Sequence, residues 1–390
     1  MKSKTFCLAP WTHGLVHTDL TMRPCCASTT VSDITVDNYI HWWNGEDMKQ
    51  LRSDLHNGIK NPGCEFCWKT EALGHNSLRQ NYNNLFNKYV KFSNIIESSK
   101  KDFVPMDGPV TWDLRLGNLC NLKCVMCSSK FSDKIQKEID NNKQIINSIF
   151  PNKLTSNTSS ISDWTNIDKI DAFFIDIKKS ARWIKLQGGE PLAVKSVRSL
   201  ITELNASQTT LSLTTNGTVL DKKLLNALSN LDHIEISISV ESADQNNNII
   251  RYGSDWNIID KNIKLLKLLP NVDIQLNHVL QITSVFYLKN VLQYSEENDL
   301  HLAIGLLKSP DYLSLNACPR EYLEQMIDDI DSITIIHKKN QYIKPYIKNI
   351  LDQTVFDSNK WYDFKNYVKV LDKIRPNKFS SVLKFKGIDI

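Results

Sequence analysis

The sequence predicts an α/β fold: a partial (β/α)6 barrel of the TIM type, preceded by a small cysteine-rich domain and followed by a helical extension. Two observations predict this architecture. Six short runs rich in apolar and β-branched residues alternate with segments in which apolar residues recur every three or four positions. Strands that alternate with helices in this way pair in parallel through right-handed crossovers. A cluster of cysteines near the start of the chain predicts the small domain.

The expected strands indicate where a ligand would bind. Ligands of parallel α/β sheets lie at the carboxyl ends of the strands, so motifs that directly follow a strand carry the most weight. The strands are expected over residues 110–116, 182–187, 210–215, 233–241, 272–280 and 301–307.

The chain divides into four expected segments. A small N-terminal domain is followed by a helix and a linker, which Pro105, Gly108 and Pro109 close. The barrel contains an insertion with a helix over 132–150, a polar loop and a second helix. This insertion either covers a substrate or forms a solvated surface. The segments are 1–82 (N-terminal domain), 83–109 (helix and linker), 110–309 (barrel, with the insertion at 130–180) and 310–390 (helical extension).

The helical extension is expected to pack on the barrel. Its last long helix precedes Pro376 and carries one apolar stripe, which is more typical of a packed helix than of a binding groove. The stripe consists of Phe364, Tyr367, Val368, Leu371 and Ile374.

The composition is that of a folded globular protein, with 41% hydrophobic and 23% charged residues over 390 positions. The net charge is only +4 and no dense basic run occurs, so neither nucleic acid nor a membrane surface is favoured as a partner. The N-terminal stretch MKSKTFCLAPW lacks the apolar core of a secretory signal. We therefore expect a cytoplasmic protein, in which clustered cysteines are more often metal ligands or catalysts than disulfides.

Three cysteines follow the first expected strand in the stretch RLGNLCNLKCVMCSS. Cys120, Cys124 and Cys127 have the spacing C-x3-C-x2-C. Thiolates suit zinc, copper(I) and iron–sulfur clusters. Three ligands can hold three irons of a cubane and leave the fourth iron open to a substrate or cofactor. A zinc loop completed by a distant fourth ligand is the alternative.

Polar and glycine motifs follow three further strands. LQGGEP contains Gly188 and Gly189, which allow a ligand to approach the backbone closely, and TTNG contains Asn216. In EISISVES, period-two alternation places Ser239 and Glu241 on one face. Each motif alone is weak, because ordinary turns use the same residues.

Five more cysteines lie near the start of the chain. Widely spaced positions that converge on one metal would stabilise a domain too small for a large core. A fully ligated second site is expected at Cys7, Cys25, Cys64 and Cys67, with zinc as the alternative metal. The sequence does not decide between Cys25 and its neighbour Cys26.

The stretch CNLKCVMC resembles the cluster loop of radical S-adenosylmethionine (radical SAM) enzymes, which have an apolar, usually aromatic, residue before the last cysteine. Here that residue is Met126. The resemblance implies that Cys120, Cys124 and Cys127 hold a [4Fe–4S] cluster whose open iron binds S-adenosylmethionine. It further implies reductive cleavage of this cofactor to a 5′-deoxyadenosyl radical, which removes a hydrogen atom from the substrate. A reductant such as flavodoxin or ferredoxin is the implied partner.

The order of the strand-end motifs also resembles this family. The segment RYGSDW resembles one in which an arginine reaches the cofactor carboxylate, although a surface ion pair would explain Arg251 equally well. For His278, near the end of the fifth strand, a structural role is the better interpretation. The resemblance implies cofactor contacts for Met126, Gly188, Gly189, Glu190, Thr215, Asn216, Ser239, Arg251 and Gln281.

The N-terminal cysteines resemble the twitch/SPASM accessory domain of radical SAM enzymes. This resemblance implies a second, auxiliary [4Fe–4S] cluster, and five cysteines favour the single-cluster, twitch-like form. The order departs from the usual pattern because the domain precedes the barrel, and Leu20 stands where glycine is common. Enzymes with such domains often modify peptides or proteins, so we expect a peptide substrate.

Other functions remain open at this point. The first is a radical SAM dehydrogenase or epimerase that acts on a sugar, an aminocyclitol or a nucleotide. The second is a non-catalytic iron–sulfur or zinc scaffold. Cys318, in LSLNACPREY after the sixth strand, could return a hydrogen atom to a substrate radical in an epimerase, although a buried cysteine that acts as a small hydrophobe is the more common case.

Overall fold

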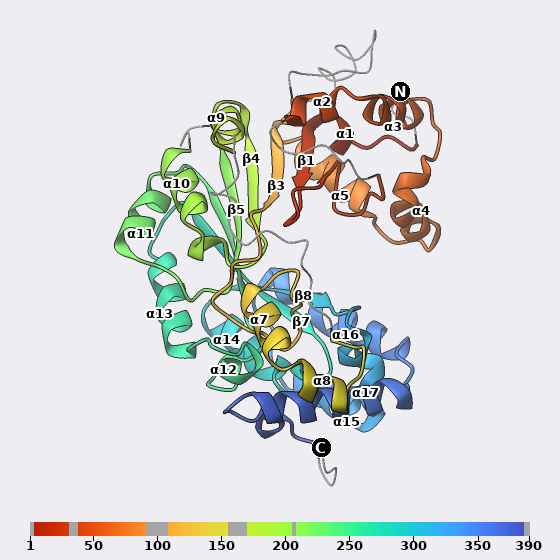
Figure 1. Ribbon diagram of the computed structural model, residues 1–390, viewed down its shortest axis with the longest axis vertical. Coiled ribbons are helices and arrows are strands. Elements are labelled where there is room, and N and C mark those ends of the chain that lie inside the picture. The colour runs from red at the N-terminus through yellow and green to blue at the C-terminus, as the bar shows by residue number, and fades with distance from the viewer. Residues whose placement is uncertain (1–3, 31–37, 91–107, 155–169, 205–207, 386–390) are drawn as a thin grey trace. The chain divides into compact units, whose positions relative to one another are not determined.

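The computed structural model describes residues 4–30, 38–90, 108–154, 170–204 and 208–385. The chain divides into two compact units, and each is considered by itself (Figure 1). The first unit comprises residues 1–118, 159–213 and 226–234, and the second comprises 119–158, 214–225 and 235–390. The expected linker over 83–109 and the polar loop of the insertion lie largely outside the described residues.

Strands alternate with helices in both units, which confirms an α/β fold with mostly parallel strands. In the first unit the strand order is β2-β1-β3-β4-β5, and in the second it is β6-β7-β8. β2 is antiparallel to β1, whereas β1, β3, β4 and β5 pair in parallel, as do β7 and β8. The strands are β1 (His13–Val16), β2 (Met22–Arg23), β3 (Thr111–Arg115), β4 (Trp183–Gln187), β5 (Thr210–Thr215), β6 (Ile234–Ser239), β7 (Val272–Leu280) and β8 (His301–Leu306).

The six expected strands are all present, and the bounds of β5 and β7 agree with the prediction to the residue. The described residues contain two further strands, β1 and β2. β1 and β2 come from the N-terminal cysteine region, and β1 pairs in parallel with β3. The sequence hides β1 because it is only four residues long and every one of them is buried, which leaves no alternation to detect.

The turn between β1 and β2 explains one departure noted in the sequence. Leu20 adopts a left-handed backbone conformation with φ of 67°, and its N–H donates to the carbonyl of His17. Glycine is the residue that adopts this conformation without strain. Leu20 therefore occupies a backbone conformation that glycine adopts more readily.

The helices follow the expected segments, with one break. The helix expected over 132–150 is divided into α7 and α8 at Asn142, where φ is −122° and ψ is 20°. The C-terminal extension is helical as predicted. The helices are α1 (Ala9–Thr12), α2 (Tyr39–Trp43), α3 (Glu46–His56), α4 (Glu65–Ala72), α5 (Leu78–Phe86), α7 (Asp133–Asn141), α8 (Lys143–Ile149), α9 (Ile170–Ser180), α10 (Lys195–Glu203), α11 (Lys222–Ser229), α12 (Asn247–Ile250), α13 (Trp256–Leu266), α14 (Leu288–Glu297), α15 (Arg320–Asp331), α16 (Ile343–Asp352) and α17 (Ser358–Ile374).

The two faces of the first unit's sheet differ in chemistry. On one face Trp112 is buried and meets the ring of Phe173, from α9, edge-on at 5.2 Å. On the other face the amide of Gln187 donates to both carboxylate oxygens of Asp113, at 2.6 and 2.8 Å. Alternation along β3 and β4 thus directs apolar side chains to the helices and polar ones to the opposite face.

Candidate functional site

The loop with Cys120, Cys124 and Cys127 follows β3 in the chain and lies in the second unit. Its backbone is fixed by the segment at the end of α12. The N–H groups of Lys123 and Val125 donate to the carbonyls of Tyr252 and Ile250, each at 2.9 Å. An irregular loop that is bonded in this way on alternate residues has little freedom to move its thiols.

Helix α7 fixes the same loop from its N-terminus. The hydroxyl of Ser132 caps the helix by accepting from the N–H of Ile135, and it donates to the carbonyl of Leu122 at 2.8 Å. Asp133 accepts from the N–H of Cys120 at 3.0 Å. Ser132, which caps α7, and Asp133, its first residue, therefore also hydrogen-bond to the cysteine loop.

The C-terminal helix braces the loop from a distant part of the sequence. The hydroxyl of Tyr367, in α17, donates to the carbonyl of Val125 at 2.6 Å. Arg375 forms an ion pair with Glu138 at 2.7 Å, and Glu138 also pairs with Lys123 of the loop. The ring of Tyr252 receives both cations, with Lys123 Nζ at 4.9 Å and the Arg375 guanidinium at 4.7 Å from its centroid. The predicted apolar stripe includes Tyr367, whereas no sequence pattern predicts the other members of this brace.

The three thiols differ in exposure. Cys124 is buried, whereas Cys120 and Cys127 are partly exposed. The sulfur of Cys120 accepts from the N–H of Leu122 at 3.4 Å. Burial raises the pKa of Cys127 to about 12 and also raises the pKa of Cys124, against which the charge of Arg251 acts. Without a metal, the thiols of Cys124 and Cys127 are therefore neutral at pH 7, and a bound metal would release their protons.

A buried ionic network contacts the most buried of these thiols. Glu241 forms an ion pair with Arg251 at 2.9 Å and accepts from the N–H of Val279 at 3.3 Å. Arg251 also donates to the sulfur of Cys124 at 3.7 Å. Burial raises the pKa of Glu241 to about 7, while Arg251 opposes the rise. Burial lowers the pKa of His278, 3.6 Å from Glu241, to about 4.

Asn216, predicted to contact the cofactor, lies against the cysteine loop. Its amide donates to the side-chain oxygen of Asn121 at 2.9 Å, and its own oxygen accepts from the hydroxyl of Thr218 at 2.6 Å. The amide of Asn121 donates to Thr218 at 2.7 Å, which closes a ring of three side chains. The TTNG motif is thus joined to the residue after Cys120.

The other predicted residues of the second unit are placed as follows. Ser239 and Thr215 are buried, and the Thr215 hydroxyl accepts from the N–H of Gly217. Gln281 is fully buried, and within the described part of the chain neither polar atom of its amide has a hydrogen-bond partner. Met126 is partly exposed on the cysteine loop. Their contacts with a cofactor remain predictions.

The GGE motif lies in the first unit, where a close approach of two strand ends requires glycine. Gly188 has φ of 129°, and a Cβ atom there would lie 2.9 Å from the carbonyl oxygen of Gly117. The N–H of Gly189 donates to this same oxygen. Glu190 is buried and accepts from the N–H of Leu192 at 3.1 Å. These contacts give the motif a structural role beside its predicted cofactor contact.

Four N-terminal cysteines line one cavity in the first unit. Cys7 precedes α1, Cys25 follows β2, Cys64 ends a 3-10 turn (Pro62–Cys64), and Cys67 lies in α4. The cavity measures about 20 Å³, and its other lining residues are Ala27, Ser28, Leu78, Arg79 and Tyr82. These four are the cysteines that the sequence predicts as ligands of a second site.

The cavity distinguishes Cys25 from Cys26. Cys26 is exposed and does not line it; the Cys26 sulfur instead lies 3.3 Å from the Tyr82 hydroxyl. Burial raises the pKa of Cys7 to about 12 and that of Cys64 to about 11. Within the residues that the structure describes, no three His, Cys, Asp or Glu side chains are grouped closely enough to hold a single metal ion.

Cys318 lies away from the solvent. It follows a 3-10 turn (Leu315–Ala317), is fully buried, and has a pKa raised by that burial. A thiol in this setting fits the packing interpretation.

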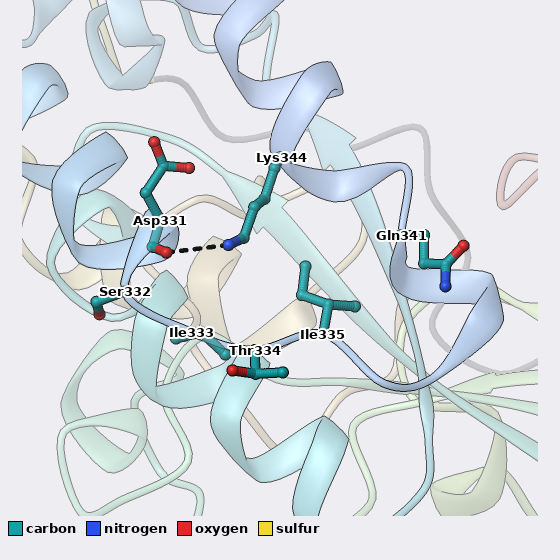
Figure 2. Close-up of a pocket in the computed structure, with 7 residues that line it drawn as sticks. All are labelled: Asp331, Ser332, Ile333, Thr334, Ile335, Gln341 and Lys344. Carbon is teal, nitrogen blue, oxygen red and sulfur yellow. Dashed lines mark hydrogen bonds between the residues drawn. The ribbon is translucent and has the colours of Figure 1, made fainter.

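A surface pocket of the second unit lies between α15 and α16 (Figure 2). Its volume is about 430 Å³, and Lys344 donates across its edge to the carbonyl of Asp331 at 3.0 Å. The lining includes none of the predicted site residues. The helices of the described ranges include none that is both long and apolar enough to cross a membrane.

Comparison with known proteins identifies the domain that contains the cysteine loop. The model of the Radical SAM superfamily matches residues 114–280, from β3 to the end of β7. The match covers less than half of the chain, and it includes the cysteine loop. Members of this superfamily are enzymes, and the family implies a [4Fe–4S] cluster and S-adenosylmethionine. The three thiols on one braced loop fit such a cluster, because they leave one iron without a protein ligand.

Solved radical SAM enzymes align with the chain at low sequence identity. A structure of anSMEcpe with bound AdoMet is 16% identical and covers 63% of this chain and 62% of its own, with a TM-score of 0.39. Streptococcus suis SuiB is 14% identical, and the alignment covers 92% of this chain and 71% of SuiB, with a TM-score of 0.37. TYW1 with a lysine-pyruvate adduct bound is 14% identical, and the alignment covers 60% of this chain and 75% of TYW1, with a TM-score of 0.30. The chain spans less than two thirds of anSMEcpe, and no curated protein matches it.

Proposed function

We propose that this protein is a radical SAM enzyme that abstracts a hydrogen atom from a peptide or protein substrate. The braced loop with Cys120, Cys124 and Cys127 is the observation that carries the proposal. It combines three thiols in the family's spacing with fixed backbone positions, within the matched domain. When bound, the cluster and S-adenosylmethionine would supply the 5′-deoxyadenosyl radical, and the protein would supply binding and orientation.

The residues around the loop have separate tasks in this proposal. The three cysteines hold the cluster, while Tyr367 and Ser132 keep the loop carbonyls in place. The predicted contacts to S-adenosylmethionine come from Met126, Gly188, Gly189, Glu190, Thr215, Asn216, Ser239, Arg251 and Gln281. For Asn216 and Arg251, proximity to the cysteine loop supports this assignment.

The four-cysteine cavity supports a second, auxiliary [4Fe–4S] cluster at Cys7, Cys25, Cys64 and Cys67. Four thiols from separate elements around one small cavity are the donor set that a closed cluster needs. Arg79 lies beside them and pairs with Glu71 at 2.8 Å. Zinc is the competing metal, and analysis of iron, sulfide and zinc in the purified protein decides between them.

The peptide substrate is proposed from the resemblance to twitch/SPASM enzymes. A sugar, aminocyclitol or nucleotide is the second substrate class, and flavodoxin or ferredoxin is the proposed reductant in a cytoplasmic setting. Cys318 is proposed as a hydrogen-atom donor only for an epimerase outcome. Normal turnover by a Cys318→Ala variant would exclude that role.

The central test is anaerobic reconstitution with iron and sulfide, followed by dithionite and S-adenosylmethionine. We expect 5′-deoxyadenosine from the wild type and none from Cys124→Ala. Cys26→Ala is the matched control, because this thiol is predicted to ligate neither cluster. Equal product from wild type and Cys124→Ala would contradict the proposal, and bound metal without affinity for S-adenosylmethionine would indicate a non-catalytic scaffold.

A further inference from the structure

Arg251 joins a fully buried carboxylate to a cysteine of the cluster loop. One terminal nitrogen of its guanidinium donates to the Cys124 sulfur at 3.7 Å, and the other donates to Glu241 at 2.9 Å. Arg251 and Cys124 are each 8% exposed, and Glu241 is 0% exposed. The cation is therefore oriented toward the sulfur by an anion that solvent does not reach.

The neighbouring groups hold this pair in one geometry. The N–H of Glu241 donates to the side-chain oxygen of Asn247 at 3.0 Å, and the Glu241 carboxylate accepts from the N–H of Val279. His278 faces the carboxylate, and its Nδ1 lies 3.0 Å from the carbonyl of Val240, so this nitrogen carries the proton. Glu241 and Arg251 form the ion pair beside the sulfur, at 2.9 Å, and the imidazole of His278 adds no charge to it.

We propose that Arg251 and Glu241 set the reduction potential of the cluster bound by Cys124, with Arg251 raising the potential and Glu241 lowering it. This inference depends on the proposed function only for the presence of that cluster. Both are positioning residues, because they act on the cluster through the cysteine sulfur and through their charges. The inferred role leaves Arg251 Nε, which has no partner among the described residues, for the predicted cofactor contact.

The physical reason is the change of charge on reduction. The [4Fe–4S] cluster accepts one electron and so becomes more negative by one unit. A nearby cation stabilises the reduced form and a nearby anion destabilises it, and both effects are strong where water is excluded. Hydrogen bonds to the ligand sulfur act in the same direction as the cation.

The two residues therefore predict shifts of opposite sign. In Arg251→Met the potential falls, because both the cation and the donor to sulfur are lost while Glu241 stays. In Glu241→Gln it rises, because the cation is no longer offset. We expect about a tenfold change in the ratio of reduced to oxidised cluster at a fixed potential, or about 59 mV for a one-electron couple. The double variant, which buries no unpaired charge, should lie between the two single variants.

The measurement is an anaerobic titration with dithionite, followed by electron paramagnetic resonance. The signal scored is the one that changes shape when S-adenosylmethionine is added, which separates it from an auxiliary cluster. Arg320→Met is the matched control, since Arg320 forms an exposed pair with Glu324. Iron content and circular dichroism establish that each variant is loaded with a cluster and folded. If Arg251→Met does not fold, Arg251→Lys replaces it. We expect a smaller fall in the potential for Arg251→Lys, because the positive charge remains and only the forked guanidinium donors are lost.

The outcomes separate this inference from the proposed function. Absence of a cluster that responds to S-adenosylmethionine in the wild type overturns both. A responsive wild-type cluster with unchanged potentials in the Arg251 and Glu241 variants, or with shifts of the same sign, overturns only the inference. Opposite shifts, together with an unchanged Arg320→Met control, support it.

Discussion

The two cysteine sites are built in different ways. In the second unit, three thiols lie close together in the sequence on one loop, and hydrogen bonds from α7, α12 and α17 fix that loop without using the sulfurs. In the first unit, four thiols come from separate short elements around one cavity. The loop is therefore fixed by protein contacts around it, whereas the proposed second cluster would join the short elements that carry its four thiols.

Charge is also used differently at the two sites. Arg251 donates directly to a cysteine sulfur, while Arg79 is engaged by Glu71 and by the carbonyl of Phe6 at 2.6 Å. One arginine is therefore placed to influence its sulfur ligand directly, and the other connects elements of the fold. The predictions below test this contrast between a braced loop and a site that a proposed metal cluster would organise.

Removal of a thiol from the four-cysteine cavity has the largest expected effect. In Cys64→Ala we expect loss of about half of the bound iron, because one of two cubanes loses a ligand. We also expect a lower thermal midpoint, since metal binding contributes folding free energy to such small segments. Iron analysis and thermal unfolding measure both. Cys26→Ala is the matched control, and equal iron loss in the two variants would contradict the assignment of Cys25 over Cys26.

Removal of Glu138 tests the brace of the cysteine loop. Glu138→Ala leaves Arg375, whose side chain is 3% exposed, without its carboxylate. Breaking a buried pair from one side costs about 3–5 kcal/mol, so we expect a loss of this size in the free energy of unfolding. Denaturant titration of the metal-free protein measures it, with Glu324→Ala as an exposed control. Equal losses in the two variants would mean that the brace does not stabilise the loop.

The stability of both units should fall in mild acid. Burial lowers the pKa of His13, in the first unit, to about 3 and that of His278, in the second, to about 4. The unfolded chain binds these protons near the ordinary pKa of about 6.5, so stability is fully present above that pH and is lost as the pH falls toward the folded values. Each histidine contributes about 1.4 kcal/mol per pH unit in this window.

The variant His13→Gln checks this pH effect. Between pH 6.5 and 5 its free energy of unfolding should fall by about 2 kcal/mol less than that of the wild type. Exposed His56 is the control site. A wild-type pH profile that His13→Gln leaves unchanged would show that His13 is not buried in its neutral form. The measurement is urea titration at several pH values on the metal-free protein.

The sequence predicts the parts of the site that are local. The spacing of Cys120, Cys124 and Cys127 and the strand-end position of TTNG are contiguous patterns, and so are the strands, whose bounds are nearly recovered. It does not predict β1, whose four residues show no alternation. Nor does it predict that Tyr367 contacts Val125, because these residues are 242 positions apart and an apolar stripe conceals a tyrosine hydroxyl.

Removal of the Tyr367 hydroxyl has the smallest expected effect on the brace, because it removes a single hydrogen bond. Tyr367→Phe keeps the buried ring in α17 and removes the donor to the Val125 carbonyl, which leaves that acceptor without this partner. A buried acceptor that loses its bond costs about 1–3 kcal/mol, so the free energy of unfolding should fall by about that amount. Tyr362→Phe, on the same helix and 63% exposed, is the matched control and should be neutral. Because the bond fixes the loop and not the sulfurs, iron content should stay at the wild-type level; loss of iron in Tyr367→Phe without loss of stability would show that the hydroxyl serves the cluster directly.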